Sequence, residues 1–139
     1  MSKFILQAEF DGRLKSDEGF LSAAGDLATL TAASGKDLYL TAAKVVLFAN
    51  SASGASVADE VVLKVNGSVV ETAKSSWNET SHATYIYEFK NIGHKVVYSV
   101  GTEILKLEVI TLDTQIDAEG FIQAIEVPTG ENPVSYTGA

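Results

Sequence analysis

The feature that most constrains the fold is a series of strand-like segments and turns across residues 27–70. A short apolar segment ends at Ser34-Gly35, and a long apolar segment over residues 37–49 follows it. Two more strand-like segments then flank Asn66-Gly67. Asn-Gly between such segments is the strongest short hairpin signal, because a type I′ turn needs positive φ at both central residues. This order predicts an antiparallel β-sandwich.

Strand-like segments separated by turns continue to residue 127, and no segment has a convincing helical periodicity. Together they amount to about eight strands, which is the strand number of a jelly roll. A jelly roll and other Greek-key sandwiches share this periodicity, so the sequence predicts an all-β antiparallel sandwich and leaves its topology open. Segment 19–28 fits a short strand or a loop. The other expected strands are 3–10, 60–65, 68–74, 84–89, 95–100, 103–112 and 121–127.

The same pattern divides the chain into three parts. Residues 1–26 are expected to form an N-terminal strand and an arm-like segment, residues 27–127 the sandwich, and residues 128–139 a flexible tail. The N-terminal strand alternates cleanly and places one set of apolar residues on a single face: Phe4, Leu6 and Phe10.

Segment 37–49 is apolar on both faces, unlike a strand with one face in water. We expect it to be covered twice, by the facing sheet and by a loop, the N-terminal segment or a neighbouring subunit. Large exposed apolar patches are rare on monomers, so the apolar residues on the second face of this segment predict self-association. The expected faces are Leu38, Leu40, Val46 and Phe48 on one side, and Tyr39, Val45 and Leu47 on the other.

The charge balance argues against a nucleic-acid partner. The 139 residues include 10 basic and 18 acidic ones, for a net charge of −8, whereas phosphate binding is driven by Lys and Arg. Cysteine is absent, so no disulfide or thiolate site can form. No segment has the apolar length of a secretory signal or a membrane span, so we expect synthesis in a cytosol and no membrane partner.

The residues that could carry chemistry are few. His82 and His94 stand apart in polar turns, whereas a zinc site takes three or four ligands. Segment 113–120, expected to be an acidic loop, is the one candidate for calcium. It lacks the spacing of a calcium loop, and Asp and Gly are ordinary turn residues. The sequence therefore predicts a protein that is not an enzyme and holds neither a metal nor a cofactor.

Three aromatic residues, Trp77, Tyr85 and Tyr87, raise the alternative of sugar binding. Exposed rings on a β-sandwich can stack on the apolar faces of sugars, and such rings also mark interfaces. Tyr85 and Tyr87 alternate with Ile86, which favours a place in the core or at a subunit contact. Trp77 lies in a polar segment and is the better candidate for an exposed contact. The alternative function is a carbohydrate-binding or receptor-binding module of a tail fibre or adhesin.

Several local features share the pattern of one group of proteins. Gly35-Lys36 ends the first turn, Asn50-Ser51 closes the long strand, and segment 61–65 leads into the hairpin. The closing strands, EILKLEVITL and GFIQAIEV, have the same character. In these features residues 27–127 resemble small β-sandwich virion proteins of tailed bacteriophages. The additional N-terminal strand departs from that pattern.

The resemblance implies a structural role, in a head decoration (cement) protein or in a tail fibre or spike. A free-standing module of this length suits decoration, where added contacts across capsomer boundaries stabilise the head. The resemblance then implies the major capsid protein as partner, and analogy with jelly-roll virion proteins implies a homotrimer. The residues expected to contact other subunits or the capsid are Phe4, Leu6, Phe10, Tyr39, Trp77, Tyr85 and Tyr87.

Overall fold

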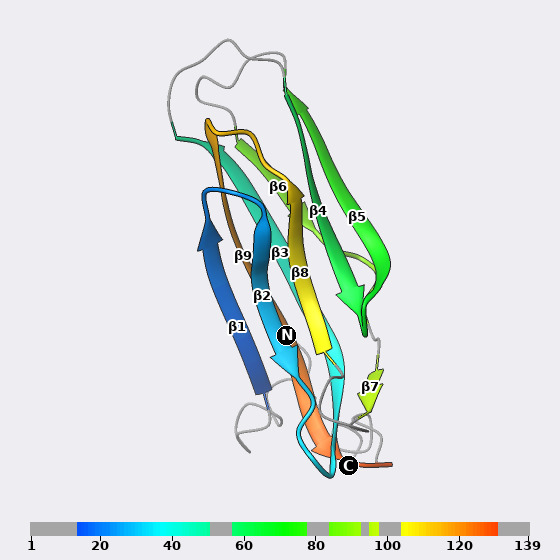
Figure 1. Cartoon of the computed structure of the whole chain (residues 1–139). Coiled ribbons are helices and arrows are strands. Elements are labelled where there is room, and N and C mark those ends of the chain that lie inside the picture. Colours follow the sequence, from blue (N-terminus) through cyan, green and yellow to red (C-terminus); the bar gives the residue numbers. More distant parts are fainter. Residues whose placement is uncertain (1–13, 51–56, 78–83, 93–94, 98–103, 131–139) are drawn as a thin grey trace.

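Two antiparallel β-sheets face each other in the molecule (Figure 1). The computed structural model describes residues 14–50, 57–77, 84–92, 95–97 and 104–130, and these form strands and turns without a helix. One sheet has the strand order β1-β9-β3-β6, with β7 also paired to β3, and the other has the order β2-β8-β4-β5. The strands are β1 Leu14–Leu21, β2 Gly25–Thr31, β3 Lys36–Ala49, β4 Val57–Val65, β5 Ser68–Trp77, β6 Thr84–Glu88, β7 Lys95–Val97, β8 Ile104–Thr111 and β9 Ile116–Pro128.

The strand order is that of a jelly roll. Strands β6 and β7 pair with successive parts of the same edge of β3, so together they occupy one strand position. The pairs β1 with β9, β2 with β8, β3 with β6 and β7, and β4 with β5 then make one long folded hairpin. Pairing of β3 with β9 and of β4 with β8 rolls that hairpin into two four-position sheets. The predicted all-β antiparallel sandwich is therefore confirmed.

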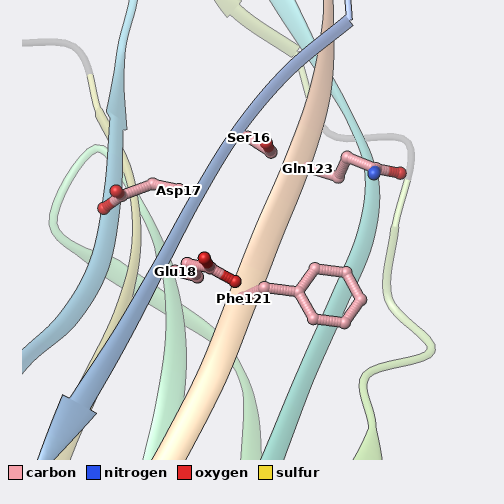
Figure 2. Close-up of a pocket in the computed structure, with 5 residues that line it drawn as sticks. All are labelled: Ser16, Asp17, Glu18, Phe121 and Gln123. Atoms are coloured by element: carbon pink, nitrogen blue, oxygen red, sulfur yellow. The ribbon is translucent and has the colours of Figure 1, made fainter.

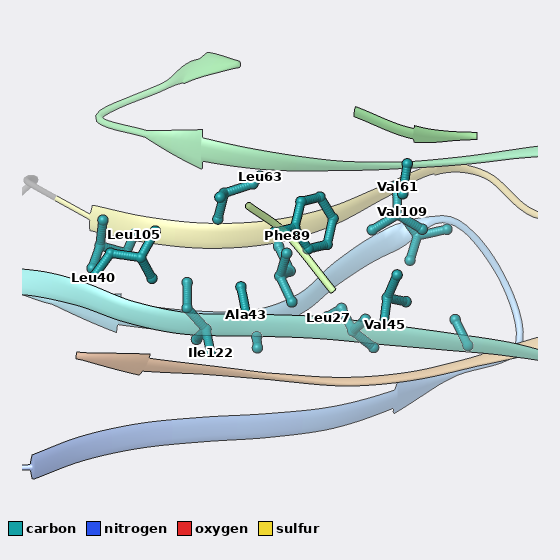
Figure 3. Close-up of a cluster of buried hydrophobic side chains, with 14 of the residues drawn as sticks. Leu27, Leu40, Ala43, Val45, Val61, Leu63, Phe89, Leu105, Val109 and Ile122 are labelled. Carbon is teal, nitrogen blue, oxygen red and sulfur yellow. The ribbon is translucent and has the colours of Figure 1, made fainter. Parts of the chain in front are cut away.

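Aliphatic side chains from both sheets fill the space between them (Figure 3). Strand β8 has the alternation expected of a strand with one face in the core and the other toward solvent. Leu105, Leu107 and Val109 are buried, whereas Lys106 and Glu108 are only partly so. The strand expected over residues 103–112 is therefore present as β8.

A β-bulge in β3 changes which residues face the core. The register against β9 shifts between Leu40 and Ala42, which makes Thr41 an extra residue on β3. The Thr41 hydroxyl donates a hydrogen bond to the backbone oxygen of Gln123, 3.2 Å away. The buried apolar side chains are Leu38 and Leu40 before the bulge, and Ala43, Val45 and Leu47 after it.

The faces predicted for segment 37–49 are therefore wrong in part. Val46 and Phe48 do not share a face with Leu38, because the bulge places them on the outward side of the sheet, where they are half-buried. A strict period of two cannot anticipate this change, since one extra residue moves every later side chain to the opposite face.

The first part of β3 packs against apolar side chains on both faces, whereas no covering segment is identified among the described residues. Leu38 lies in the main core, and Tyr39 on the opposite face belongs to a second, smaller cluster. That cluster also contains Leu14, Ile125 and Val127, and the last two are fully buried. Apolar packing on both faces explains why this part of the strand is apolar on both sides.

Among the described residues, the sandwich already includes Leu14 and does not start at residue 27, because β1 and the start of β2 belong to its sheets. Strand β1 was not predicted from the sequence, because Asp17 and Gly19 occupy its inward positions. Large apolar residues at these positions would have indicated a strand with one face in the core. The Asp17 carboxylate accepts a hydrogen bond from the backbone N–H of Thr29 on β2, at 2.8 Å. At Gly19, a Cβ would lie 1.9 Å from the backbone oxygen of Leu27. These contacts hold the two edge strands together and protect them from pairing with another chain.

Asn66-Gly67 closes the β4–β5 hairpin, as predicted. The φ angle is 51° at Asn66 and 84° at Gly67, in agreement with a type I′ turn. Asn66 also holds the start of β8. Its Oδ1 accepts a hydrogen bond from the Ile104 N–H at 3.0 Å, and its own N–H donates to the Ile104 oxygen at 2.9 Å.

Replacing Gly67 by Val should lower the free energy of unfolding by about 1–2 kcal/mol, because a β-branched residue is strained at positive φ. No atom lies within 4 Å of the position that the new Cβ would take, so the loss reports backbone strain alone. Urea denaturation measures the change, and Ser68→Val, on the exposed neighbouring strand residue, serves as the control. A neutral result for Gly67→Val would mean that the turn is of another type.

The segment expected to be an acidic loop, 113–120, is mostly strand, because β9 begins at Ile116. A tight turn joins β8 to β9, and in it the N–H of Ile116 donates to the Asp113 oxygen at 3.0 Å. Asp59, which is buried on β4, accepts a hydrogen bond from the Asp113 N–H at 2.8 Å. Asn50, directly after β3, hydrogen-bonds the backbone of the same turn. The turn is therefore fixed from two strands.

Several predictions lie outside the described residues. They concern the strand at 3–10, the two histidines and residues 131–139 of the tail. The start of the tail is held to the β2–β3 turn. The Thr129 N–H donates to the Gly35 oxygen at 3.0 Å, and the Gly130 N–H donates to the Asp37 carboxylate at 3.1 Å.

Candidate functional site: the outward side of the β1-β9-β3-β6 sheet

The two sheets differ in the side chains that they turn to solvent. On the β2-β8-β4-β5 sheet, ion pairs cross from each strand to the next, and we call this surface the ion-paired face. Opposite charges on neighbouring strands are typical of a solvated sheet surface. The nitrogen–oxygen distances are 3.3 Å for Asp26–Lys106, 2.6 Å for Lys64–Glu108 and 3.7 Å for Glu60–Lys74.

The β1-β9-β3-β6 sheet instead turns outward a mixture of apolar and acidic side chains. Its register aligns two rows across the strands, each residue being the partner of the next. One row reads Phe20, Glu119, Val46, Ile86, and the other reads Glu18, Phe121, Lys44, Glu88. Phe48 lies one row further along β3. We call these nine residues the outer face.

The apolar part of the outer face is substantially accessible. The side chain of Phe20 is 56% exposed and that of Ile86 is 59% exposed, although they lie on opposite edges of the sheet. The Phe20 ring lies against the ring of Phe48, with centroids 6.2 Å apart. Between the edges, Val46 and Phe121 are half-buried. Solvent therefore contacts apolar side chains from all four strands.

Shallow hollows mark the outer face. One has a volume of about 470 Å³ and lies over β1 and β9 (Figure 2). Phe121 and Gln123 line it from β9, and Ser16 and Glu18 line it from β1. Asp17 also borders it, but Figure 2 shows its carboxylate directed away from the ring of Phe121. A second hollow, of about 240 Å³, shares Glu18 and Phe121 and extends over β3 to Lys44 and Val46.

The charges of the outer face are mostly negative. Glu18, Glu88 and Glu119 are exposed, and Lys44 is the one basic residue among the nine. Although Lys44 and Glu88 are register partners, the described residues include no ion pair that involves Lys44. The outer face thus combines apolar area with carboxylates that form no ion pair within the described part of the chain.

The described residues contain no group of three or more His, Asp or Glu side chains placed to hold a metal ion. Asp113 lies in the β8–β9 turn, and its carboxylate accepts a hydrogen bond from the Gln115 N–H at 2.9 Å. Asp117 and Glu119 lie on β9, and Asp117 accepts a hydrogen bond from the Asn50 side chain at 2.9 Å. The acidic residues considered for calcium are therefore spread over a turn and a strand. The described residues also include no helix that could cross a membrane.

Two shifted pKa values lie away from the outer face, at Glu71 on β5 and at its partner Tyr87 on β6. The Glu71 carboxylate accepts hydrogen bonds from the Tyr87 hydroxyl at 2.5 Å, the Lys90 N–H at 2.9 Å and the Asn91 N–H at 2.6 Å. Burial alone would raise the pKa of Glu71, but the bonds from Tyr87 and the two amides, with the charge of Lys90, outweigh it and lower that pKa below 4.5. The bond to Glu71, followed by burial, raises the pKa of Tyr87 to about 12.

This network joins the two sheets and is structural. Glu71 belongs to the β2-β8-β4-β5 sheet, whereas Tyr87 lies on β6 and the two amides follow β6 directly. Perturbed pKa values often mark functional sites, but here both carboxylate oxygens are used by partners within the fold.

Replacing Glu71 by Gln should lower the free energy of unfolding by about 1 kcal/mol at pH 7. This is a low value for hydrogen bonds to a charged group, and we expect it because water partly solvates the site. The depressed pKa means that the contribution is present above pH 4.5 and is lost as pH falls through the lower, folded-state value. The raised pKa of Tyr87 means that its contribution is present below pH 10 and is lost as pH approaches about 12.

Urea denaturation between pH 3 and pH 7 provides the measurement, with Thr72→Ser, on the exposed residue next to Glu71, as the control. The difference between wild type and Glu71→Gln should shrink at the acid end. Tyr87→Phe should also be less stable, and the double variant should lose less than the sum of the two. A difference that stays constant down to pH 3 would show that the carboxylate charge is irrelevant.

The predicted contact residues whose side chains the structure describes do not gather at one place. Tyr39 lies in the smaller apolar cluster. Tyr85 and Tyr87 are half-buried against the main core, and their ring centroids lie 6.2 Å apart. Trp77 ends β5, and its side chain is not among those described. The other predicted contacts, Phe4, Leu6 and Phe10, lie outside the described residues.

Sequence reasoning missed most of the outer face. The apolar character of segment 37–49 on both sides was the one available signal, and it points to Val46 and Phe48. Phe20 and Phe121 lie on different strands, and only pairing with β9 and β3 brings them together. No local pattern marks the face because its residues come from four segments far apart in the chain.

Fold and site together define the class of this protein: a jelly-roll β-sandwich with a filled core and an apolar, acidic sheet surface. No protein-family model matches the chain, and no curated protein matches it. The resemblance to virion proteins of tailed bacteriophages stays a prediction.

Proposed function

We propose that this protein is a non-enzymatic structural component of a bacteriophage virion, and that it decorates the capsid and stabilises the head. The observation that carries the proposal is the outer face, an extended sheet surface with exposed apolar side chains such as Phe20 and Ile86. Exposed apolar surface of this kind is typical of protein contact sites. The jelly-roll topology supports the proposal, since capsid proteins commonly use it, although fold alone is a weaker argument than the surface. The protein would be made in the host cytoplasm and act in the virion.

The shape and charge of the hollows support a role without catalysis. A carboxylic acid that donates a proton near neutral pH needs burial to raise its pKa. Glu18 and Glu119, which border the hollows, are exposed on an open sheet surface. The buried carboxyl group of Asp59 lies beneath the β8–β9 turn and is bound by Ser75 and the Asp113 amide.

The direct test is the protein content of virions. In particles purified by density gradient from the phage that carries this gene, quantitative mass spectrometry should find the chain in a fixed ratio to the major capsid protein. Heads assembled after deletion of the gene should lose their DNA at a lower temperature, and addition of the purified protein should restore the wild-type value. Absence of the chain from virions would refute the proposal, and a ratio of a few copies per particle would favour the tail.

Self-association is the second part of this proposal, and a homotrimer is the expected state. Light scattering at micromolar concentration should give about three times the monomer mass of 14.7 kDa. A mass near 14.7 kDa would refute self-association. A mass near twice that value would refute the trimer alone.

A carbohydrate-binding or receptor-binding module is the second candidate. The hollow of Figure 2 favours it, because Phe121 lines it together with the polar side chains of Ser16, Glu18 and Gln123. An aromatic ring flanked by hydrogen-bonding groups suits a sugar. Binding to a glycan array that is lost in Phe121→Ala but kept in Val69→Ala would favour this function over decoration.

A further inference from the structure

We propose that the outer face is the surface that docks on the capsid, and that the capsid presents lysine or arginine side chains beside aliphatic or aromatic ones at that contact. This inference rests on the proposed function and assigns its partner surface. It concerns a part of the molecule that includes none of the seven residues predicted from the sequence to make such contacts.

The first step is the apolar area. Phe20 and Ile86 project from opposite edges of one sheet, with Val46 and Glu119 between them in the same row. Ile92, 48% exposed, lines a further hollow together with Phe121. Removing such side chains from water drives association, and a contact centred on them would span the whole width of the sheet.

The second step is the charge. Glu18, Glu88 and Glu119 alternate with the apolar side chains, and Lys44 is the only basic group among the nine. A partner with basic side chains would pair with these carboxylates, whereas a second outer face would oppose carboxylate to carboxylate. The ion-paired face of a second copy does not supply such basic groups either, because its lysines already bind carboxylates of neighbouring strands. Charge complementarity therefore favours a basic partner over a second copy.

The third step is the geometry of the β1 edge. Where β1 borders the outer face, its other side is held to β2 by the Asp17–Thr29 hydrogen bond and by the close approach of Gly19 to Leu27. Addition of a partner strand at this edge is therefore obstructed. On the β1 side of the sheet, docking must therefore use the side chains of the sheet surface, and these are residues of the outer face.

The experiment measures binding of the purified protein to heads assembled after deletion of its gene. Phe20→Ser with Ile86→Ser removes the most exposed apolar groups and should raise the Kd about tenfold or more. Glu18→Gln with Glu119→Gln removes two negative charges and should raise the Kd at low salt about tenfold. This second variant should also reduce the loss of affinity that wild type shows when NaCl is raised from 50 to 500 mM.

Matched controls lie on the other sheet. Val69→Ser with Ile110→Ser also replaces two exposed apolar side chains, which are 52% and 40% exposed. Thr31→Lys with Thr72→Lys changes the net charge by the same amount as the two Glu→Gln replacements. Both residues are exposed on β2 and β5. Both controls should bind heads with the wild-type Kd, and all four variants should unfold at the wild-type temperature.

The outcomes separate the inference from the proposed function. If wild type binds and the outer-face variants bind equally well, the docking surface is elsewhere and the inference is wrong, while the decoration function stands. If wild type fails to bind heads and is absent from virions, the decoration function is refuted, and the capsid partner with it. If light scattering shows that the outer-face variants lose oligomeric mass, the face is a contact between copies, which contradicts a basic partner.

Discussion

Replacing Gly19 by Ala should lower the free energy of unfolding by about 3 kcal/mol, near the upper end for an overpacked interior. The new Cβ would lie 1.9 Å from the backbone oxygen of Leu27, a separation that no pair of non-bonded atoms tolerates. Because the opposing atom belongs to the backbone of β2, no rotation of a side chain relieves the clash. The two edge strands would have to separate, which would also stretch the hydrogen bond from the Thr29 N–H to Asp17.

Gly120, the register partner of Gly19 on β9, tests the packing around Leu27 from the neighbouring strand. A Cβ there would lie 2.7 Å from the Lys44 backbone oxygen and 2.8 Å from the Leu27 side chain. Gly120→Ala should lower the free energy of unfolding by about 2 kcal/mol, because the Leu27 side chain can move aside but the Lys44 backbone cannot. The double variant should lose less than the sum, because both new methyl groups displace Leu27.

Chemical denaturation at pH 7 gives these values, and Ser16→Ala provides the control on an exposed residue of the same strand. That control should stay within about 0.5 kcal/mol of wild type. A loss below about 1 kcal/mol for Gly19→Ala would mean that β1 and β2 lie further apart than this structure places them.

Replacing Asp59 by Ala should lower the free energy of unfolding by about 2–4 kcal/mol. The side chain is fully buried, and its carboxyl oxygens accept hydrogen bonds from the Asp113 N–H at 2.8 Å and the Ser75 hydroxyl at 3.3 Å. Alanine leaves both donors without their acceptor in a site that excludes water. A buried donor without an acceptor carries the full cost of its desolvation.

Two further variants separate the contributions of the two hydrogen bonds to this loss of stability. Asp59→Asn keeps one oxygen that can accept from the Asp113 amide, so it should lose about half as much as Asp59→Ala. Ser75→Ala removes only the longer bond and should lose about 1 kcal/mol. Equal losses for Asp59→Asn and Asp59→Ala would show that the hydrogen bond to the turn contributes little. Val69→Ala, on the exposed part of β5, is the unaffected control.

Local chemistry was enough to predict some elements. Asn66-Gly67 is specified by the need for positive φ at two successive residues, which few other pairs tolerate. Strand β8 was predicted because apolar residues on its inner side alternate with charged residues on its outer side. In both cases the signal lies within a few consecutive residues.

Other elements depended on contacts between distant segments. Strand β1 reads as polar because Asp17 and Gly19 point toward β2, where a hydrogen bond and close packing replace apolar burial. The start of β9 reads as a loop because Asp117 and Glu119 lie on its outward side. The bulge at Thr41 leaves no local signal in the sequence. It places Val46 and Phe48 on the outward side of the sheet, where they belong to the outer face.

The sequence by itself determined the all-β class, the hairpin turn and the absence of cysteine chemistry, because each depends on residue type or on spacing along the chain. The tertiary structure alone decided the strand order, the bulge and the composition of the outer face. Its exposed members Phe20 and Ile86 are 66 positions apart, and they become parts of one surface only when β9 and β3 pair between them. Strand pairing is long-range and depends on the total burial of the assembled sandwich, so no local pattern along the chain encodes it.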